Sequence, residues 1–191
     1  MGVEPINIDA LADSIDESVL PDDFMRYARL KAKELDRVFT DQCQKSIYKE
    51  EGFAYECNLR IDQLKNVALF DNAGYDLVLI YIWLDNVAIS KQRVAKRVSQ
   101  GGHFVDNSSI QENFKSGLAN LDSSFLDWSE VYMFDNSVDF QEGGLESNFP
   151  LLLHIKEQKI QYCTNLFLQK ENIAEKLPHI HKEVKAHLQI D

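Results

Sequence analysis

The chain has 191 residues, 45% of them hydrophobic, which is enough for one sizeable core, so we expect a single domain over residues 1–191. Its 20 basic and 31 acidic residues give a formal net charge of −11, which opposes the cationic surface that duplex nucleic acid or an anionic membrane requires. The longest apolar run, residues 77–84, is too short to span a bilayer, and the three cysteines form no C-x-x-C pair, so we expect a cytoplasmic protein without a membrane span, disulfide framework or metal site.

The first third of the chain is predicted to alternate between strand and helix. Residues 5–9 form a short β-type stretch that ends in a carboxylate, and apolar residues at helical spacing predict a helix over residues 22–47. Residues 53–59 are predicted to form a buried strand with polar groups at its end. Residues 60–72 are predicted to be helical.

Residues 76–84 form the clearest strand of the sequence. The run is continuously apolar, as is typical of parallel strands that are buried on both faces. We therefore expect it to be central in the sheet, with the strand over residues 53–59 or a second chain beside it. An empty position there would leave several buried backbone groups unpaired, at about 1–3 kcal/mol each.

Two helices and a further strand follow. A helix over residues 88–100 is ended by two glycines, and a helix over residues 109–121 has Ser108 or Ser109 as its expected N-cap. Residues 130–135 are predicted to form a strand that ends in a polar turn. Alternating strands and helices indicate an α/β domain with a largely parallel sheet.

The C-terminal part is predicted to be a hairpin and a helix added to this core. Residues 151–155 and 159–163 flank a short turn, and residues 171–187 form a helix interrupted at Pro178. Ligands of parallel sheets bind beyond the carboxyl ends of the strands. The polar residues expected at those ends are Asp9, Glu56 with Asn58, Asp85, and Asp135 with Asn136.

Several motifs occur together in one order and carry a family resemblance. They are Asn7-Ile8-Asp9, Phe53-Ala54-Tyr55-Glu56, Gly74-Tyr75-Asp76 leading into Ile80-Tyr81-Ile82-Trp83-Leu84, the run from Arg93 through Arg97 to Gly101-Gly102-His103, and Phe134-Asp135-Asn136-Ser137. This pattern resembles the zeta-toxin-like P-loop kinases over residues 5–137. The resemblance implies a three-layer P-loop-kinase-like fold with a mostly parallel sheet, in which residues 1–140 form the core with a lid region over 98–121, and residues 141–191 add the hairpin and helix.

The resemblance also implies roles for individual residues. Asp9 would be the catalytic base that takes a proton from the acceptor hydroxyl, although an aspartate before an apolar stretch is also a common helix cap. Glu56 and Asn58 would hold the acceptor substrate, or they would simply end an exposed strand.

Phosphate and base contacts are implied for the second half of the chain. Arg93 and Arg97 lie one helical turn apart and would clamp phosphates, whereas without the resemblance such a pair is usually a solvated face. Asp135 and Asn136 correspond to the region that surrounds the nucleotide base in the family. They are equally well explained by an Asx turn that closes the strand.

Two features of the family are missing from this sequence. None of the eight glycines is followed by lysine, so the Gly-x-x-x-x-Gly-Lys-Ser/Thr loop that would hold ATP phosphates and Mg²⁺, together with its strand, is absent. Residues 110–114 read Ile-Gln-Glu-Asn-Phe where relatives usually have lid arginines. Phosphoryl transfer depends on positioning and charge stabilisation, and a single arginine can be worth about 10³–10⁵ in rate.

The sequence therefore predicts a degenerate kinase-like protein that is inactive alone. It would act by binding a partner protein, a copy of itself that completes the sheet, or a nucleotide-type ligand. Two alternatives remain: an active kinase of a nucleotide sugar such as UDP-N-acetylglucosamine whose phosphate loop lies upstream or on a partner chain, and a regulatory or antitoxin-like subunit. ATP and Mg²⁺ are implied by the resemblance alone, and neither is expected to bind this chain tightly.

Overall fold

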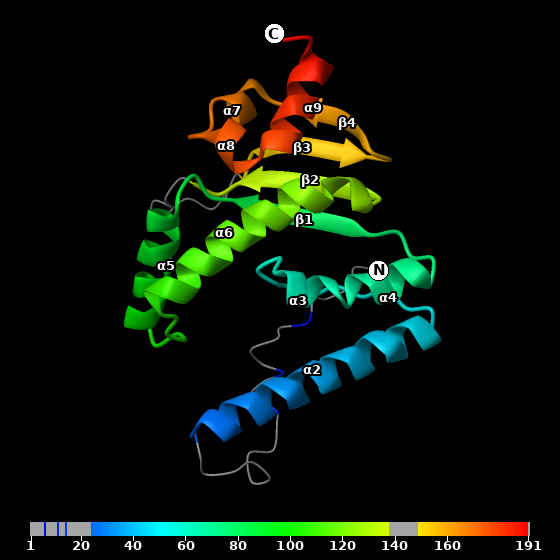
Figure 1. Cartoon of the computed structure of the whole chain (residues 1–191), viewed down its shortest axis with the longest axis vertical. Helices are drawn as coiled ribbons and strands as arrows, with labels where there is room; N and C mark the ends of the chain where they lie inside the picture. The colour runs from blue at the N-terminus through cyan, green and yellow to red at the C-terminus, as the bar shows by residue number, and fades with distance from the viewer. Residues whose placement is uncertain (1–5, 7–10, 12–13, 15–23, 138–148, 191) are drawn as a thin grey trace. The chain divides into compact units, whose positions relative to one another are not determined.

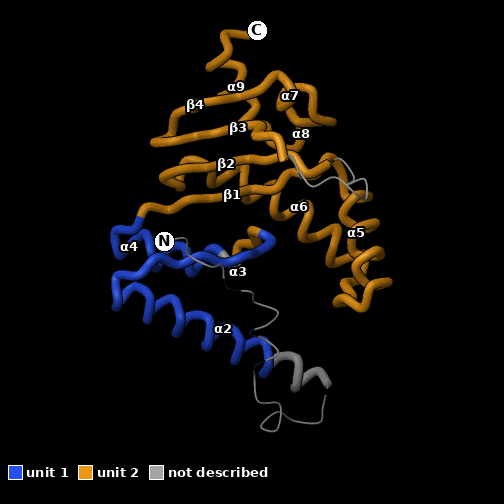
Figure 2. The backbone as a smooth tube through the Cα atoms, turned by 180° about the vertical axis from the view of Figure 1, so that it is seen from behind, with its two compact units in different colours: residues 1–58, 62–75 blue, residues 59–61, 76–191 orange. Residues whose placement is uncertain are grey.

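The computed structural model describes residues 6, 11, 14, 24–137 and 149–190. The chain divides into two compact units (Figure 2). The first comprises residues 1–58 and 62–75, and the second comprises residues 59–61 and 76–191. Each unit is described separately below.

The first unit is organised around a long helix, α2 (Phe24–Tyr48), with the short helices α3 (Ile61–Leu64) and α4 (Val67–Asn72) later in the sequence. Phe39 of α2 and Phe70 of α4 are both buried. The ring of Phe53 lies 5.8 Å from that of Phe39 and 5.1 Å from that of Phe70, between centroids. Aromatic packing therefore holds the segment after α2 in place.

The predicted strand over residues 53–59 is wrong. Among the described residues, this segment forms one isolated parallel β-bridge, between Tyr55 and Ile6. Its aromatic side chains pack on α2 and α4, and Leu59 has a left-handed φ of 53°, which an extended strand cannot accommodate. The helix expected over residues 60–72 is divided into α3 and α4.

The second unit contains one mixed sheet and several helices. Its strands are β1 (Val78–Trp83), β2 (Glu130–Asp135), β3 (Leu151–Lys156) and β4 (Lys159–Cys163). Between β1 and β2 lie α5 (Val87–Ser99), α6 (Asn107–Ser124) and the short 3₁₀ helix η2 (Phe125–Asp127). After β4 come α7 (Asn165–Leu168), α8 (Ile173–Lys176) and α9 (Pro178–Leu188).

The strand order is β1-β2-β3-β4. β1 and β2 are parallel, whereas β2–β3 and β3–β4 are antiparallel. The chain is thus a mixed α/β protein, but the expected mostly parallel sheet is wrong, because the sheet is mostly antiparallel. The hairpin belongs to the sheet rather than being added to it, and its tight turn places Glu157 and Gln158 at φ 48° and 61°.

β1 lies at the edge of this four-stranded sheet, not at its centre. Val78, Ile80 and Ile82 are 51%, 63% and 46% exposed, so the prediction that the strand is central and buried on both faces is wrong. A continuous apolar run identifies a strand, but it does not specify which strands flank it.

The opposite face of the sheet forms the core of the second unit. Figure 1 shows α6 and α9 lying over this face. Fully buried side chains come from both layers of this packing: Trp83, Val131, Met133, Leu153 and Ile155 of the sheet, Leu121 of α6, and Ile180 and Val184 of α9. Burial on this scale is the main source of stability of the unit.

Helix boundaries follow local capping signals. Asn86 caps α5, accepting from the backbone N–H groups of Ala88 and Ile89. Asp106 caps α6 by accepting from the Ser109 N–H at 2.9 Å, so the predicted serine cap is wrong. A carboxylate two or three residues earlier competes successfully for the same role.

Within the described part of the chain, no helix has both the length and the apolar character needed to cross a bilayer.

Candidate functional site

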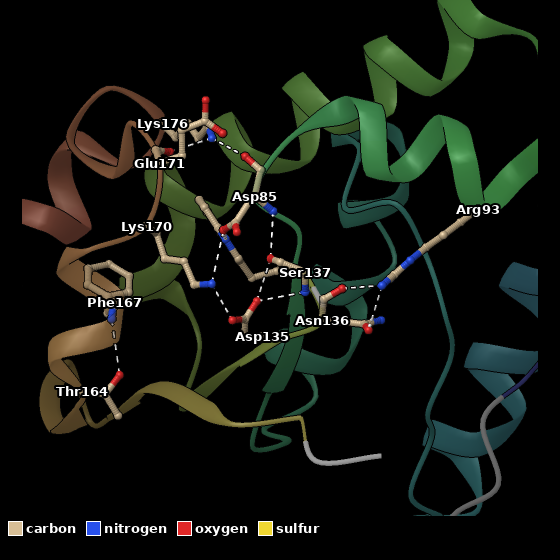
Figure 3. Close-up of polar contacts among 11 residues, drawn as sticks. Asp85, Arg93, Asp135, Asn136, Ser137, Thr164, Phe167, Lys170, Glu171 and Lys176 are labelled. Atoms are coloured by element: carbon tan, nitrogen blue, oxygen red, sulfur yellow. Dashed lines mark hydrogen bonds and ion pairs between the residues drawn. The ribbon is translucent and has the colours of Figure 1, made fainter. Parts of the chain in front are cut away.

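The candidate site lies at the carboxyl ends of the two parallel strands of the second unit. Asp85 follows β1 and Asp135 ends β2. Because the two strands are parallel, both residues lie at the same end of the sheet (Figure 3). The Asn136 N–H donates to the Trp83 carbonyl at 2.9 Å, which holds the two strand ends together. Asp85, Asp135 and Asn136 thus lie together beyond the carboxyl ends of β1 and β2, where the sequence predicts polar residues.

Asp135 is the most enclosed charged residue of the site, with 5% of its surface exposed. Its Oδ1 accepts from the Ser137 N–H at 3.0 Å and from the Ser137 hydroxyl at 2.7 Å, which is the geometry of an Asx turn. Its Oδ2 accepts from Lys170 Nζ. All of these contacts lie within the chain itself.

Lys170 is a buried cation that sequence reasoning missed. It lies just after α7, is 9% exposed, and its Nζ reaches Asp85 Oδ1 at 3.3 Å in addition to Asp135. The side chains of Lys170 and Asp135 point toward one another in Figure 3. Nothing in the local sequence distinguishes this lysine from the other basic residues, because its partners are far away along the chain.

A second lysine and a tryptophan complete the arrangement. Lys176 Nζ donates to the carbonyls of Asp85 and Glu171, and it lies 5.5 Å from the centre of the Trp83 ring. Trp83 Nε1 donates to Asp85 Oδ1 at 2.8 Å. The ionic groups therefore connect the ends of β1 and β2 with the α7–α8 segment and stabilise this arrangement.

The pKa of Asp135 reflects competing effects. Burial alone would raise it, but hydrogen bonds from Lys170 and Ser137 outweigh burial and hold the pKa below its ordinary value of 3.8. The folded-state pKa is lowered, so the charged Asp135 carboxylate stabilises the folded protein. This contribution to the free energy of unfolding is present above the unfolded-state pKa of 3.8 and is lost as the pH falls through the folded-state pKa.

We expect the stability difference between the wild type and Asp135→Asn to be constant above about pH 5 and to narrow below pH 3.8. The reason is that protonated Asp135 resembles the neutral asparagine, so in both proteins Lys170 then lacks the negative charge at position 135 and keeps only Asp85 as an anionic partner. Urea unfolding at a series of pH values measures this. A difference that is as large at pH 3 as at pH 7 would contradict the ion pair.

The two arginines assigned to phosphate make contacts within the chain. Arg93 Nη2 donates to the Asn136 carbonyl at 2.5 Å and to Asn136 Oδ1 at 3.1 Å. Arg97 Nη2 donates to the His103 carbonyl at 3.3 Å. Arg93 and Asn136 are thus brought together, whereas Arg97 contacts the loop after α5. A phosphate would have to compete with these bonds.

The other predicted site residues are distributed as follows. Glu56 and Asn58 are exposed residues of the first unit. Asp9 lies outside the described residues. The expectation that Asp9, Glu56, Arg97 and Asp135 surround one cleft therefore stays a prediction. In the described part of the chain, His, Cys, Asp and Glu side chains form no group of three suited to a metal ion.

No family model, curated protein or solved structure matches this chain. The resemblance to zeta-toxin-like kinases therefore rests on the motifs of the sequence alone.

Proposed function

We propose that this protein acts by binding another polypeptide along strand β1 and does not transfer phosphoryl groups by itself. One observation carries the proposal: the edge strand β1 is entirely apolar and three of its side chains are about half exposed or more. Natural edge strands are usually protected by charged residues, proline or bulges. Exposed apolar surface of this kind is characteristic of an interaction site.

The opposite edge of the sheet provides a contrast. β4 begins with Lys159 and carries Gln161, whose side chains are exposed. Polar and cationic residues on an edge strand discourage pairing with another chain. The β4 strand thus carries cationic and polar side chains, whereas β1 carries no charged side chain, and this difference supports a dedicated binding role for β1.

The contacts of the ionic residues favour a structural role over catalysis. Asp135 and Lys170 neutralise one another in a buried pair, and Arg93 is held by Asn136. A kinase needs cations that are available to the transferring phosphate. The active-kinase alternative, with a nucleotide sugar as acceptor, would also require a phosphate-binding loop from another polypeptide segment.

We expect calorimetry with Mg-ATP to show no binding tighter than about 1 mM, because backbone N–H groups of a phosphate loop supply most of the affinity in P-loop enzymes. UDP-N-acetylglucosamine should likewise give no heat in the micromolar range. If weak ATP binding through Arg93 occurs, Arg93→Gln should abolish it and Lys96→Gln, on the same helix, should not. Micromolar binding of either nucleotide would contradict the noncatalytic assignment.

A further inference from the structure

The backbone of β1 has a defined polarity at the sheet edge. The carbonyls of Leu77 and Trp83 accept from the N–H groups of Glu130 and Asn136 on the β2 side. Backbone groups alternate along a strand, so Leu77, Leu79, Tyr81 and Trp83 direct theirs toward β2. Val78, Ile80 and Ile82 consequently direct their N–H and C=O groups away from β2, toward the side on which no strand of the described residues pairs with β1.

We propose that the occupant of this edge is a second copy of the chain, paired antiparallel through β1 about a twofold axis at Ile80. The inference rests on the proposed function and specifies its partner. A twofold axis makes each residue pair occur twice, so the strand must be complementary to itself. With Ile80 opposite its own copy, Val78 lies opposite Ile82 of the second copy.

Val78, Ile80 and Ile82 are the residues whose backbone N–H and C=O groups point away from β2. This register is the one that places these three residues opposite one another. Each such pair exchanges two N–H···O bonds, and every cross-strand pair joins two β-branched aliphatic side chains. Moving the axis to Leu79 or Tyr81 leaves one of the three residues opposite a position beyond β1. The geometry thus favours a single register.

Charge does not oppose a second copy at this position. The chain carries a formal net charge of −11, so most of its surface would repel another copy. β1 contains no charged residue, and the nearest carboxylates on either side are Asp76 and Asp85. In the proposed register, Asp76 lies opposite Leu84 of the second copy and Asp85 lies opposite Tyr75, so no two carboxylates face one another.

Sedimentation over a range of protein concentrations tests the assembly. We expect the wild type to be a dimer and Ile82→Lys to weaken dimerisation at least about tenfold, because two lysines would be placed in an apolar strand pair. Tyr162→Lys is the matched control, since Tyr162 lies on the other edge strand and is also 46% exposed. It should dimerise like the wild type.

Cross-linking tests the register without depending on a destabilising charge. The exposed Cys57 is first replaced by serine, while burial raises the pKa of Cys43 and Cys163 to about 11 and leaves these thiols unreactive near neutral pH. In this background, a short bismaleimide should join two copies of Ile80→Cys. A mixture of Val78→Cys and Ile82→Cys should cross-link more than Val78→Cys alone, whose thiols would be about 13 Å apart along the strand.

The outcomes separate this inference from the proposed function. A protein that stays monomeric at about 100 µM overturns the second-copy inference, and so does a dimer that Tyr162→Lys breaks and Ile82→Lys leaves intact. Protected Ile80 and Ile82 amides in a monomer would show that another segment of the same chain covers the edge, which also overturns it. Micromolar Mg-ATP binding would instead overturn the noncatalytic assignment, whatever the oligomeric state.

Discussion

Replacing Lys170 by methionine is expected to lower the free energy of unfolding by about 3–5 kcal/mol, which is the usual cost of removing one partner of a buried ion pair. The side chains of Lys170 and Asp135 are 7% and 5% exposed. Methionine fills a similar volume, so the loss reports the charge rather than a cavity. Asp135 would keep its bonds from Ser137 but would remain a buried anion without its cation. Urea unfolding of the full chain measures the difference.

Two further variants make this test specific. Lys182→Met, on the exposed side of α9, should change stability by less than about 0.5 kcal/mol. Asp135→Asn combined with Lys170→Met removes both charges while keeping an acceptor for Ser137, so it should be more stable than either single variant. A loss below about 1 kcal/mol for Lys170→Met, or strictly additive losses in the double variant, would contradict a buried, coupled pair.

Local elements of the fold could be predicted because their signals are local. The apolar run at 77–84 contains β1, and the turn predicted at residues 156–158 contains Glu157 and Gln158, which lie between β3 and β4. The helix predicted over residues 171–187 with an interruption at Pro178 is divided into α8 and α9, and α9 begins at Pro178. Each depends on backbone preferences or on the period of apolar residues within about ten positions. These signals do not depend on the fold around them.

The arrangement of the strands could not be predicted in the same way. β1 is as apolar as a central strand, yet among the strands of the described residues it pairs with β2 alone. The hairpin occupies the other side of β2 and makes the sheet mostly antiparallel, a choice that depends on long-range packing. The aromatic residues at 53 and 55 gave a strand pattern, but packing of rings against α2 and α4 determined their structure.

The residues of the candidate site also differ in whether local sequence signals could predict them. Asp85, Asp135 and Asn136 could be found because they follow predicted strands whose ends coincide. Lys170 could not, because it lies 35 positions after Asp135 in a segment without a motif. A cation that becomes important only through its tertiary partners has no local signature. This is why the resemblance placed Asp135 in a nucleotide-base region, whereas in the structure Asp135 forms a buried ion pair with Lys170.

The second large effect is expected at Asp122, a buried residue of α6 that caps a distant helix. Its two carboxylate oxygens accept from the backbone N–H groups of His179 at 3.1 Å and Ile180 at 2.9 Å, and from His179 Nδ1 at 2.7 Å. α9 begins at Pro178, and Leu177 at its N-cap position has no side chain able to accept these bonds. Asp122 therefore provides the cap from another element, and its charge is favourable at a helix N-terminus.

Asp122→Ala is expected to lower the free energy of unfolding by about 2–4 kcal/mol, because it removes the cap and leaves buried N–H groups without acceptors. Asp122→Asn keeps one acceptor and should lose about 1–2 kcal/mol. His179→Ala removes only the contact of a ring that is 73% exposed, so it should lose less than about 1 kcal/mol, as should the exposed control Asp127→Ala. Urea unfolding gives the energies, and hydrogen exchange should show the amides of His179 and Ile180 opening first in Asp122→Ala. Unchanged protection of these two amides would show that α9 does not depend on this carboxylate.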